Sequence, residues 1–309
     1  MKILIELPTW LGDTVMTTPA IENILLRYPN ANLVLIGTNT TIQALQNHPK
    51  VIKTIQLNKN ILSFYSFSKK IGIFDIFISF RGSFRSRILK FFIDSSFKYQ
   101  FDKSNYKNQH QVEKYNSFIC ESLKFVEMPQ RLMLYKQEQN LPSKVKPVLG
   151  INPGAAYGSA KKWDLEKFAE VAANLSKNYD IQIFGGVNER NVASKIEKLL
   201  IQYGVENFNN LSGETSISEL IDYISNLDLF LTGDSGPMHI AASFDIPTVS
   251  IFGPTKDDET SQWMNPKNVI IKKNLECQPC MRRKCPLGHH NCMKMIKTNE
   301  VLNALKLVN

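Results

Sequence analysis

The chain has 309 residues, of which 43% are hydrophobic and 21% are charged, an ordinary composition for a globular protein that forms its core without disulfides. This length exceeds what one hydrophobic core usually contains, so we expect two domains of about 150 residues. The formal charge of +9 favours anionic partners, namely nucleic acid, phosphorylated lipids or an anionic membrane surface, although solubility alone would also explain it.

Strand-like and helix-like segments alternate through both halves of the chain, which is typical of parallel βαβ units in an α/β protein. In the first half we expect strands at residues 2–7, 33–36, 51–57 and 74–80, and helices at residues 19–28, 40–46 and 111–124. Because Glu6 interrupts the first apolar run, the pattern predicts a buried strand and neither a signal peptide nor a transmembrane helix. We therefore expect a cytoplasmic protein.

Residues 136–147 (KQEQNLPSKVKP) are polar, contain two prolines and lack periodicity, which predicts a linker between domains 1–140 and 147–309. In the second half we expect strands at residues 148–151, 181–184, 229–232 and 248–252, and helices at residues 165–176, 192–203 and 218–226. Ser216 and Glu219 have the spacing of a capping box. Two Rossmann-like domains would bind a ligand in a cleft between them, at the carboxyl ends of their strands.

The first predicted strand is followed by residues 8–13 (PTWLGD), which place a glycine turn and then Asp13 at the start of a helix. Asp13 is a candidate catalytic carboxylate, and the alternative is an aspartate that caps the helix. The segment lacks the G-x-G-x-x-G pattern, which disfavours a nicotinamide site in this half.

Two further segments follow strands of the second half. Residues 152–163 (NPGAAYGSAKKW) combine small residues with Lys161 and Lys162, which suits an anion held by backbone amides, and a flexible surface loop is the alternative. Residues 232–239 (TGDSGPMH) form a turn that leads into a new helix, which also suits an anion. Asp234 would then accept hydrogen bonds from sugar hydroxyls or balance His239, and the alternative is a capped helix with a core histidine.

Four of the five cysteines lie within 16 residues, here called the Cys-rich segment (residues 277–292). The Cys277-x2-Cys280 spacing suits a zinc knuckle, whereas the spacings to Cys285 and Cys292 match no standard zinc pattern. The alternatives for these cysteines are structural zinc, free or redox-labile thiols, and disulfides. Disulfides are less favoured in a reducing compartment. We expect the four sulfur atoms to converge on one site without a catalytic role.

Three arginines, Arg81, Arg85 and Arg87, follow the fourth predicted strand of the first half. Arginine makes bidentate contacts with phosphate and carboxylate groups, so this cluster is a candidate site for an anionic substrate. A solvated loop is the alternative.

Taken together, residues 10–13 (WLGD), residues 153–163 with Lys161-Lys162-Trp163, and residues 234–239 (DSGPMH) resemble glycosyltransferase family 9 in their order and spacing. The resemblance runs over essentially the whole chain. It implies a GT-B architecture, in which an N-terminal acceptor-binding domain and a C-terminal donor-binding domain face each other across a cleft. It also implies an inverting transfer without a catalytic metal or cofactor.

The resemblance further implies roles for individual residues. Asp13 matches the general base of the family, and Lys161 matches the lysine that holds the donor diphosphate. The resemblance also implies that further residues contact the ribose, the adenine, the sugar and the phosphates of the donor. These residues are Ser159, Glu189, Thr215, Asp234, Ser235, Gly236 and His239. Some relatives carry hydroxyl side chains just before the lysine, where this chain has Ala156 and Tyr157, so contacts there would come from backbone amides or from Ser159.

The chain is most similar to the heptosyltransferase II branch of the family, which implies ADP-heptose as donor and the inner-core heptose of a lipid A-core molecule as acceptor. It also implies peripheral contact with the inner face of the inner membrane. Heptosyltransferases of type I or III and other sugar-nucleotide enzymes of GT-B shape are the alternatives among enzymes. A nucleic-acid-binding protein is the alternative outside enzymes, disfavoured because the aromatic residues lie mostly in apolar runs.

Overall fold

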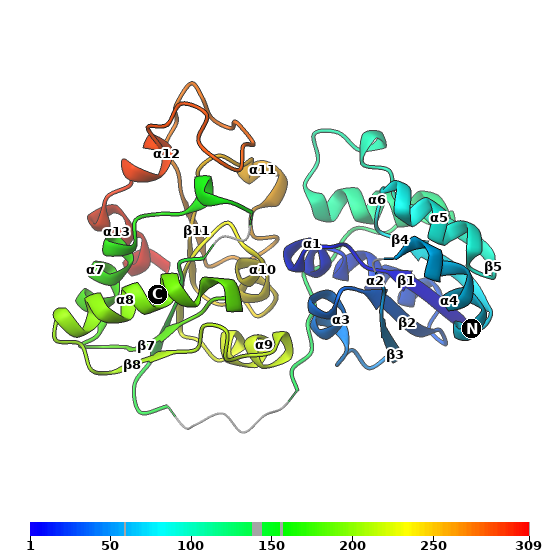
Figure 1. Ribbon diagram of the computed structural model, residues 1–309, viewed down its shortest axis with the longest axis horizontal. Coiled ribbons are helices and arrows are strands. Elements are labelled where there is room, and N and C mark those ends of the chain that lie inside the picture. The colour runs from blue at the N-terminus through cyan, green and yellow to red at the C-terminus, as the bar shows by residue number, and fades with distance from the viewer. Residues whose placement is uncertain (59, 138–143, 155–156, 309) are drawn as a thin grey trace. The chain divides into compact units, whose positions relative to one another are not determined.

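The computed structural model describes residues 1–58, 60–137, 144–154 and 157–308. The chain divides into two compact units, Met1–Tyr135 and Lys136–Asn309 (Figure 1). Each unit contains one sheet of parallel strands with helices packed on it. The middle of the predicted linker, residues 138–143, lies outside the described residues, as do Ala155 and Ala156.

The sheet of the first unit has five strands in the order β3-β2-β1-β4-β5. Their bounds are β1 (Lys2–Glu6), β2 (Asn32–Gly37), β3 (Val51–Gln56), β4 (Phe74–Ser79) and β5 (Ser95–Gln100). Ile3, Leu4 and Ile5 of the central strand are all fully buried. Successive side chains of a strand point to opposite faces, so a continuous apolar run here means that helices cover both faces of the sheet.

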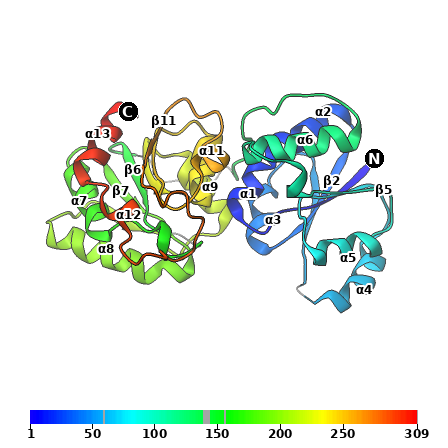
Figure 2. The same ribbon diagram turned by 90° about the horizontal axis from the view of Figure 1, so that it is seen from above.

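The helices of the first unit form two groups. Helices α1 (Leu11–Met16), α2 (Thr18–Arg27), α3 (Asn39–Leu45) and α6 (Gln111–Leu123) contact one another. Helices α4 (Phe64–Ile71) and α5 (Phe84–Phe92) pack together apart from α2 and α6, as Figure 2 shows, and bury Phe64 and Leu89 against Leu4 and Phe77 of the sheet. Two short 3-10 helices, η1 (Ile61–Ser63) and η2 (Lys103–Asn105), complete the unit.

The sheet of the second unit has six strands in the order β11-β10-β9-β6-β7-β8. Their bounds are β6 (Val148–Asn152), β7 (Asp180–Ile183), β8 (Phe208–Asn210), β9 (Leu229–Gly233), β10 (Thr248–Ile251) and β11 (Asn268–Ile271). Only glycine fits at Gly150 in β6, because a Cβ there would lie 2.4 Å from Leu227 Cδ1 and 2.9 Å from Phe230 Cδ2.

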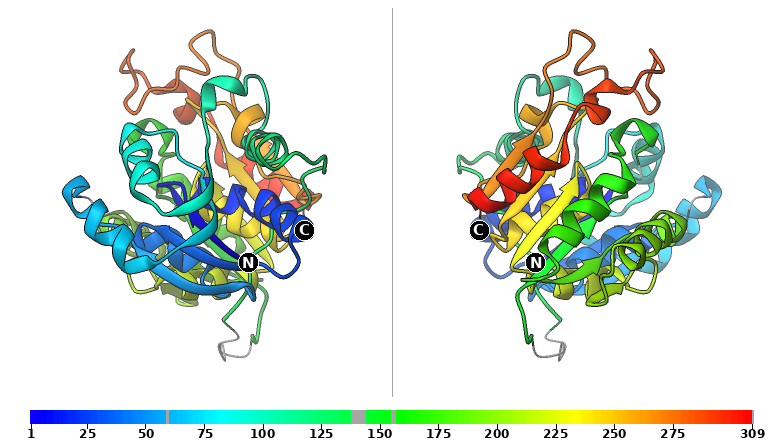
Figure 3. Two further views of the ribbon diagram at one scale, coloured as in Figure 1. Left: turned by 90° about the vertical axis from the view of Figure 1, so that its right-hand side faces the viewer. Right: turned by 90° about the vertical axis from the view of Figure 1, so that its left-hand side faces the viewer.

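Helices α7 (Leu165–Leu175), α8 (Arg190–Gln202) and α13 (Thr298–Val308) share one apolar core with the sheet of this unit (Figure 3). Helices α9 (Ile217–Ser225) and α10 (Gly236–Ser243) contact each other. The shorter elements are η3 (Ser159–Lys161), η4 (Val187–Glu189), α11 (Asp257–Thr260) and α12 (Asn291–Lys294). None of the helices in the described ranges is long and apolar enough to cross a membrane.

Every strand and helix predicted above is present, with ends within two residues of the predicted ones. The capping box is confirmed, because Ser216 Oγ accepts from the Glu219 amide at 3.2 Å and Glu219 Oε2 accepts from the Ser216 amide at 2.7 Å. The strands that we did not predict, β5, β8 and β11, are all edge strands with partly exposed side chains. An edge strand does not require the continuous apolar run by which a central parallel strand is recognised.

Candidate active site

The carboxyl ends of β6 and β9 carry a network of polar side chains. Asn152 and Thr232 end these neighbouring strands and lie opposite each other in register. Asn152 Nδ2 donates to Thr232 Oγ1 at 3.2 Å and to Ser235 Oγ at 3.0 Å. Ser235 is the N-cap residue of α10, so these bonds hold the start of that helix against the edge of the sheet.

Lys161 and Asp234 form an ion pair at the same edge. Lys161 Nζ donates to Asp234 Oδ2, and at 3.3 Å to the main-chain oxygen of Asp234. Thr255, which follows β10, donates its hydroxyl to the same Asp234 Oδ2 at 2.6 Å. The two charged side chains are only 11% and 7% exposed. The structure thus brings together Lys161 and Asp234, two predicted donor-binding residues that are 73 positions apart. Lys161 is the counter-charge of Asp234, which the sequence had not indicated.

Glu189, the candidate ribose ligand, lies close to the loop that follows β6. Its Oε2 accepts a hydrogen bond from the Gly186 amide at 2.8 Å, as in a capping box. A Cβ on Gly154 would lie 2.1 Å from Glu189 Oε1, so a larger residue there would move the carboxylate from this position. The carboxylate therefore combines the ordinary capping role with a position at the carboxyl edge of the sheet.

The other predicted donor residues take different positions in this unit. Gly236 begins α10, and His239 is buried within that helix. Ser159 begins η3 and is exposed. Thr215 is half-buried and directly precedes Ser216, the cap of α9.

Asp13 lies in the first turn of α1 and is half-buried. The N-cap of α1 is Trp10, in an extended backbone conformation, so the alternative that Asp13 caps the helix is wrong. Tyr115 of α6 is buried nearby: burial, and then the negative charge of Asp13, raise the pKa of the Tyr115 hydroxyl well above its usual value. Asp13 is thus a half-buried carboxylate near a buried phenol, and not the N-cap residue of α1.

A second carboxylate at this edge, Glu6, was not predicted as part of the site. It ends β1, is fully buried, and accepts hydrogen bonds from the hydroxyls of Ser79 at 2.6 Å and Ser86 at 2.9 Å. Arg81 Nη1 lies 3.5 Å from Glu6 Oε1. Burial raises the pKa of Glu6, whereas Ser79, Arg81 and Ser86 act in the opposite direction. The signal in the sequence was a charged residue inside an apolar strand.

The three predicted arginines occupy different surroundings. Arg81 follows β4, whereas Arg85 and Arg87 belong to α5, so the alternative of a solvated loop is wrong for these two arginines. Arg85 donates to the main-chain oxygen of Asn58 and lies 5.0 Å above the Phe64 ring. Burial and the charge of Arg81 lower the pKa of Arg85. Arg87 is exposed and interacts electrostatically with Asp102.

The four cysteines of the Cys-rich segment are free thiols; Cys292 is buried and the others are half-buried. Burial, and then the charges of Cys285, Cys277 and Cys280, raise the pKa of Cys292 to about 11. Backbone amides, that of His290 first, lower the pKa of Cys285. The thiols are therefore near one another. Within the residues that the structure describes, however, no three His, Cys, Asp or Glu side chains are arranged to hold a metal ion.

The Cys-rich segment contacts the loop that carries Lys161. The Ala160 amide donates to Arg283 O at 3.1 Å, and His290 Nε2 lies 2.8 Å from Ala160 O. Tyr157 donates its hydroxyl to Met281 O at 2.8 Å. The Tyr157 ring lies 4.7 Å from the ammonium of Lys161 and 5.4 Å from the guanidinium of Arg283. The sequence did not predict Arg283 as a neighbour of this loop, because the contacts join segments more than 120 residues apart.

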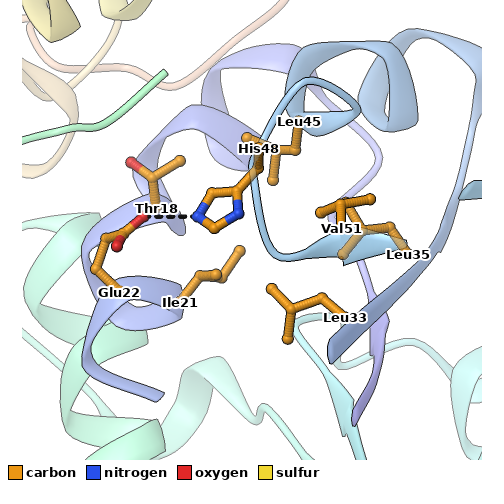
Figure 4. A pocket seen from close by; sticks show the side chains of 8 residues that line it. All are labelled: Thr18, Ile21, Glu22, Leu33, Leu35, Leu45, His48 and Val51. Carbon is orange, nitrogen blue, oxygen red and sulfur yellow. Dashed lines mark hydrogen bonds and ion pairs between the residues drawn. The ribbon is translucent and has the colours of Figure 1, made fainter. Parts of the chain in front are cut away.

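A small pocket in the first unit lies elsewhere (Figure 4). His48 Nε2 is 2.9 Å from Glu22 Oε1 at its rim. The lining is mostly apolar and includes none of the predicted site residues: Thr18, Ile21, Glu22, Leu33, Leu35, Leu45, His48 and Val51. We therefore do not assign the candidate site to this pocket.

Comparison with known proteins shows the family of the chain. Residues 65–291 match the model of glycosyltransferase family 9 (heptosyltransferase). Lipooligosaccharide heptosyltransferase 2 of Campylobacter jejuni is 41% identical over 99% of this chain and 98% of its own. Lipopolysaccharide heptosyltransferase 2 of Salmonella typhimurium is 25% identical over 99% and 97%. The solved structure of Escherichia coli ADP-heptose LPS heptosyltransferase II superposes with a TM-score of 0.83 at 24% identity, covering 100% of this chain and 98% of that one.

These matches confirm the expected α/β fold of GT-B type and decide in favour of an enzyme over a nucleic-acid-binding protein. The matched region spans parts of both units and includes Lys161, Asp234 and the first three cysteines of the Cys-rich segment. The chain belongs to glycosyltransferase family 9, the heptosyltransferase family.

Proposed function

We propose that the enzyme transfers L-glycero-D-manno-heptose from ADP-heptose to the inner-core heptose of lipooligosaccharide or lipopolysaccharide, with inversion at the transferred carbon. The observation that carries the proposal is the network of Lys161, Asp234 and Thr255 at the carboxyl edge of the second sheet, in a chain that matches heptosyltransferases along its length. The enzyme would work in the cytoplasm, at the inner face of the inner membrane, because lipid A anchors the acceptor there.

The proposal assigns the donor to the second unit. An ammonium group has three N–H donors, and Lys161 uses two of them on Asp234, so one is left for a phosphate oxygen. Ser235 and the amides at the start of α10 would bind the same diphosphate, because a helix start attracts negative charge. Glu189 would bind the ribose, Thr215 would lie near the adenine, and Ser159, Asp234, Gly236 and His239 would contact the sugar and the phosphates.

Asp13 is the proposed general base. A sugar hydroxyl is too weak an acid to attack unaided, so a carboxylate within hydrogen-bond reach takes its proton as the new bond forms. The acceptor oxygen bonds to the anomeric carbon while the bond from that carbon to the diphosphate breaks, and ADP leaves. Positive charge on the carbon and negative charge on the leaving group both rise in this step, and Lys161 would stabilise the latter.

An Asp13→Asn variant tests the base and the function together. Wild-type enzyme, given ADP-heptose and a truncated core acceptor that ends in heptose, should add one heptose and release ADP, as read by mass spectrometry. The variant should turn over about 10²- to 10⁴-fold more slowly, because asparagine cannot take a proton. Its ADP affinity, measured by calorimetry, should not change. Asp94→Asn, at an exposed acidic residue of the same unit, is the control and should behave as wild type.

The donor site is tested by Lys161→Ala, with its neighbour Lys162→Ala as matched control. Removing one charge-assisted hydrogen bond costs about 1.5–3 kcal/mol, so Lys161→Ala should raise the Kd for ADP about 10- to 100-fold. Lys162→Ala should change it little. Calorimetry gives both values, and thermal melting shows whether each variant is folded. Equal losses in the two variants would mean that overall charge, and not the position of Lys161, determines donor binding.

Arg81, Arg85 and Arg87 are the proposed contacts for the anionic core sugars and phosphates. Arg81 has the best-defined position, because the buried Glu6 fixes its guanidinium. Arg81→Ala should therefore raise the acceptor KM about tenfold or more, as expected for a lost charge-assisted contact, and leave the ADP affinity unchanged. Arg87→Ala, at an exposed position, should have the smaller effect. A fall in ADP affinity with an unchanged acceptor KM would show that the substrates are assigned to the wrong units.

Structural zinc at Cys277, Cys280, Cys285 and Cys292 is the remaining part of the proposal, and the transfer itself uses no metal. The Cys-x2-Cys spacing and the proximity of the thiols support it, although the thiols are not arranged as in a formed site. Protein purified without chelator should contain about one zinc or iron ion, the two metals suited to four thiolates, by mass spectrometry. Cys277→Ser/Cys280→Ser should lose it and Cys120→Ser should keep it. Metal-free wild type would leave the thiols free.

A further inference from the structure

Helices α4 and α5 of the first unit present large apolar side chains to solvent. Phe64 and Leu89 on their inner sides are fully buried. On their outer sides Tyr65 is 60% exposed, Phe84 73% and Phe91 78%, and Leu62, one turn before α4, is 87% exposed. The pair lies side by side on the surface of the unit (Figures 2 and 3).

These side chains form one surface, here called the α4–α5 patch (Leu62, Tyr65, Phe84 and Phe91). Phe84 and Phe91 are seven residues apart in α5, which places them on one helix face, and Leu62 of η1 lies three residues before Tyr65 of α4. Phe92 joins the two helices: its ring centroid lies 6.0 Å from that of Tyr65 and 5.3 Å from that of Phe91. Scattered exposed apolar residues are ordinary, but a contiguous group indicates an interaction site.

Positive charge is concentrated in the same part of the chain. Residues 51–100 contain nine basic and two acidic residues, a net charge of +7 out of the +9 of the whole chain. The first unit has seventeen basic and nine acidic residues, a net of +8, which leaves +1 for the second. Lys69 and Lys70 are exposed in the last turn of α4, and Arg87 is exposed between Phe84 and Phe91 on α5. Of the two acidic residues, Asp75 accepts a hydrogen bond from the main-chain nitrogen of Lys2.

We propose that the α4–α5 patch, with the basic residues beside it, docks the enzyme on an anionic lipid bilayer. Aromatic and aliphatic side chains enter the boundary between headgroups and acyl chains, while lysine and arginine contact the anionic headgroups. The mixture of leucine with phenylalanine and tyrosine suits this boundary better than it suits the stacking of nucleic-acid bases. This docking proposal rests on the proposed function in one respect: an enzyme that acts on a lipid-anchored acceptor has to reach the bilayer.

The test measures binding of the full chain to vesicles, without donor or acceptor. We expect co-sedimentation with phosphatidylethanolamine vesicles that contain about one third phosphatidylglycerol, little with phosphatidylcholine vesicles, and weaker binding as salt screens the charges. Phe84→Ser/Phe91→Ser should reduce the partition coefficient about tenfold or more. Lys69→Gln/Lys70→Gln should reduce it on the anionic vesicles in particular.

The matched control is Val126→Ser/Met128→Ser. These residues belong to the same unit and are 92% and 74% exposed, but they follow α6, on the other group of helices. The control should bind vesicles as wild type does. All variants should melt at the same temperature and act equally on a deacylated, soluble acceptor, because the changed side chains lie outside the proposed substrate contacts.

Three outcomes would overturn the docking proposal. Wild type could fail to bind anionic vesicles, the control could lose as much binding as the patch variant, or the patch could instead mediate a dimer that Phe84→Ser/Phe91→Ser dissociates in analytical ultracentrifugation. Because the vesicle assay contains no sugar nucleotide, its result does not depend on the transfer reaction. Failure of heptose transfer with intact vesicle binding would contradict the proposed function alone.

Discussion

Parallel strands bring all their carboxyl ends to one edge of a sheet, and the candidate site in each unit depends on this constraint. In the second unit it brings together Asn152, Thr232, Asp234 and Thr255, which follow three different strands. In the first it brings Glu6 at the end of β1 beside Ser79 and Arg81 at the end of β4. These side chains are far apart in sequence. Their proximity therefore results from the topology of the sheet and not from a local sequence motif.

Both edges hold a cation in the same way. A buried carboxylate accepts hydrogen bonds from hydroxyl groups and fixes a basic side chain: Asp234 with Thr255 and Lys161, and Glu6 with its two serines and Arg81. A buried charge without partners would be very unfavourable, and the hydroxyl groups and the cation offset that cost. A cation held in place before the substrate arrives loses little side-chain entropy when it binds a phosphate or carboxylate.

The sequence predicted the central strands, most of the longer helices except α13, and one capping box, because burial on both faces and helical periodicity are local signals. It did not predict α4 and α5, whose outer faces are apolar where a surface helix is normally polar. It proposed Lys161, Asp234 and Asp13 as candidates from their positions after strands. It missed Glu6, Thr255 and Arg283, whose roles depend on contacts with distant segments that periodicity and spacing do not encode.

The contacts between the Cys-rich segment and the loop of residues 157–160 have a consequence for the speed and strength of binding. Three hydrogen bonds tie this loop to a segment more than 120 residues later in the chain. A loop that is already ordered does not have to lose its conformational freedom when a ligand arrives, which favours tight and rapid binding. Oxidation or metal loading of the four thiols would alter the segment that orders the loop, and would thereby change the position of the proposed diphosphate ligands beside it.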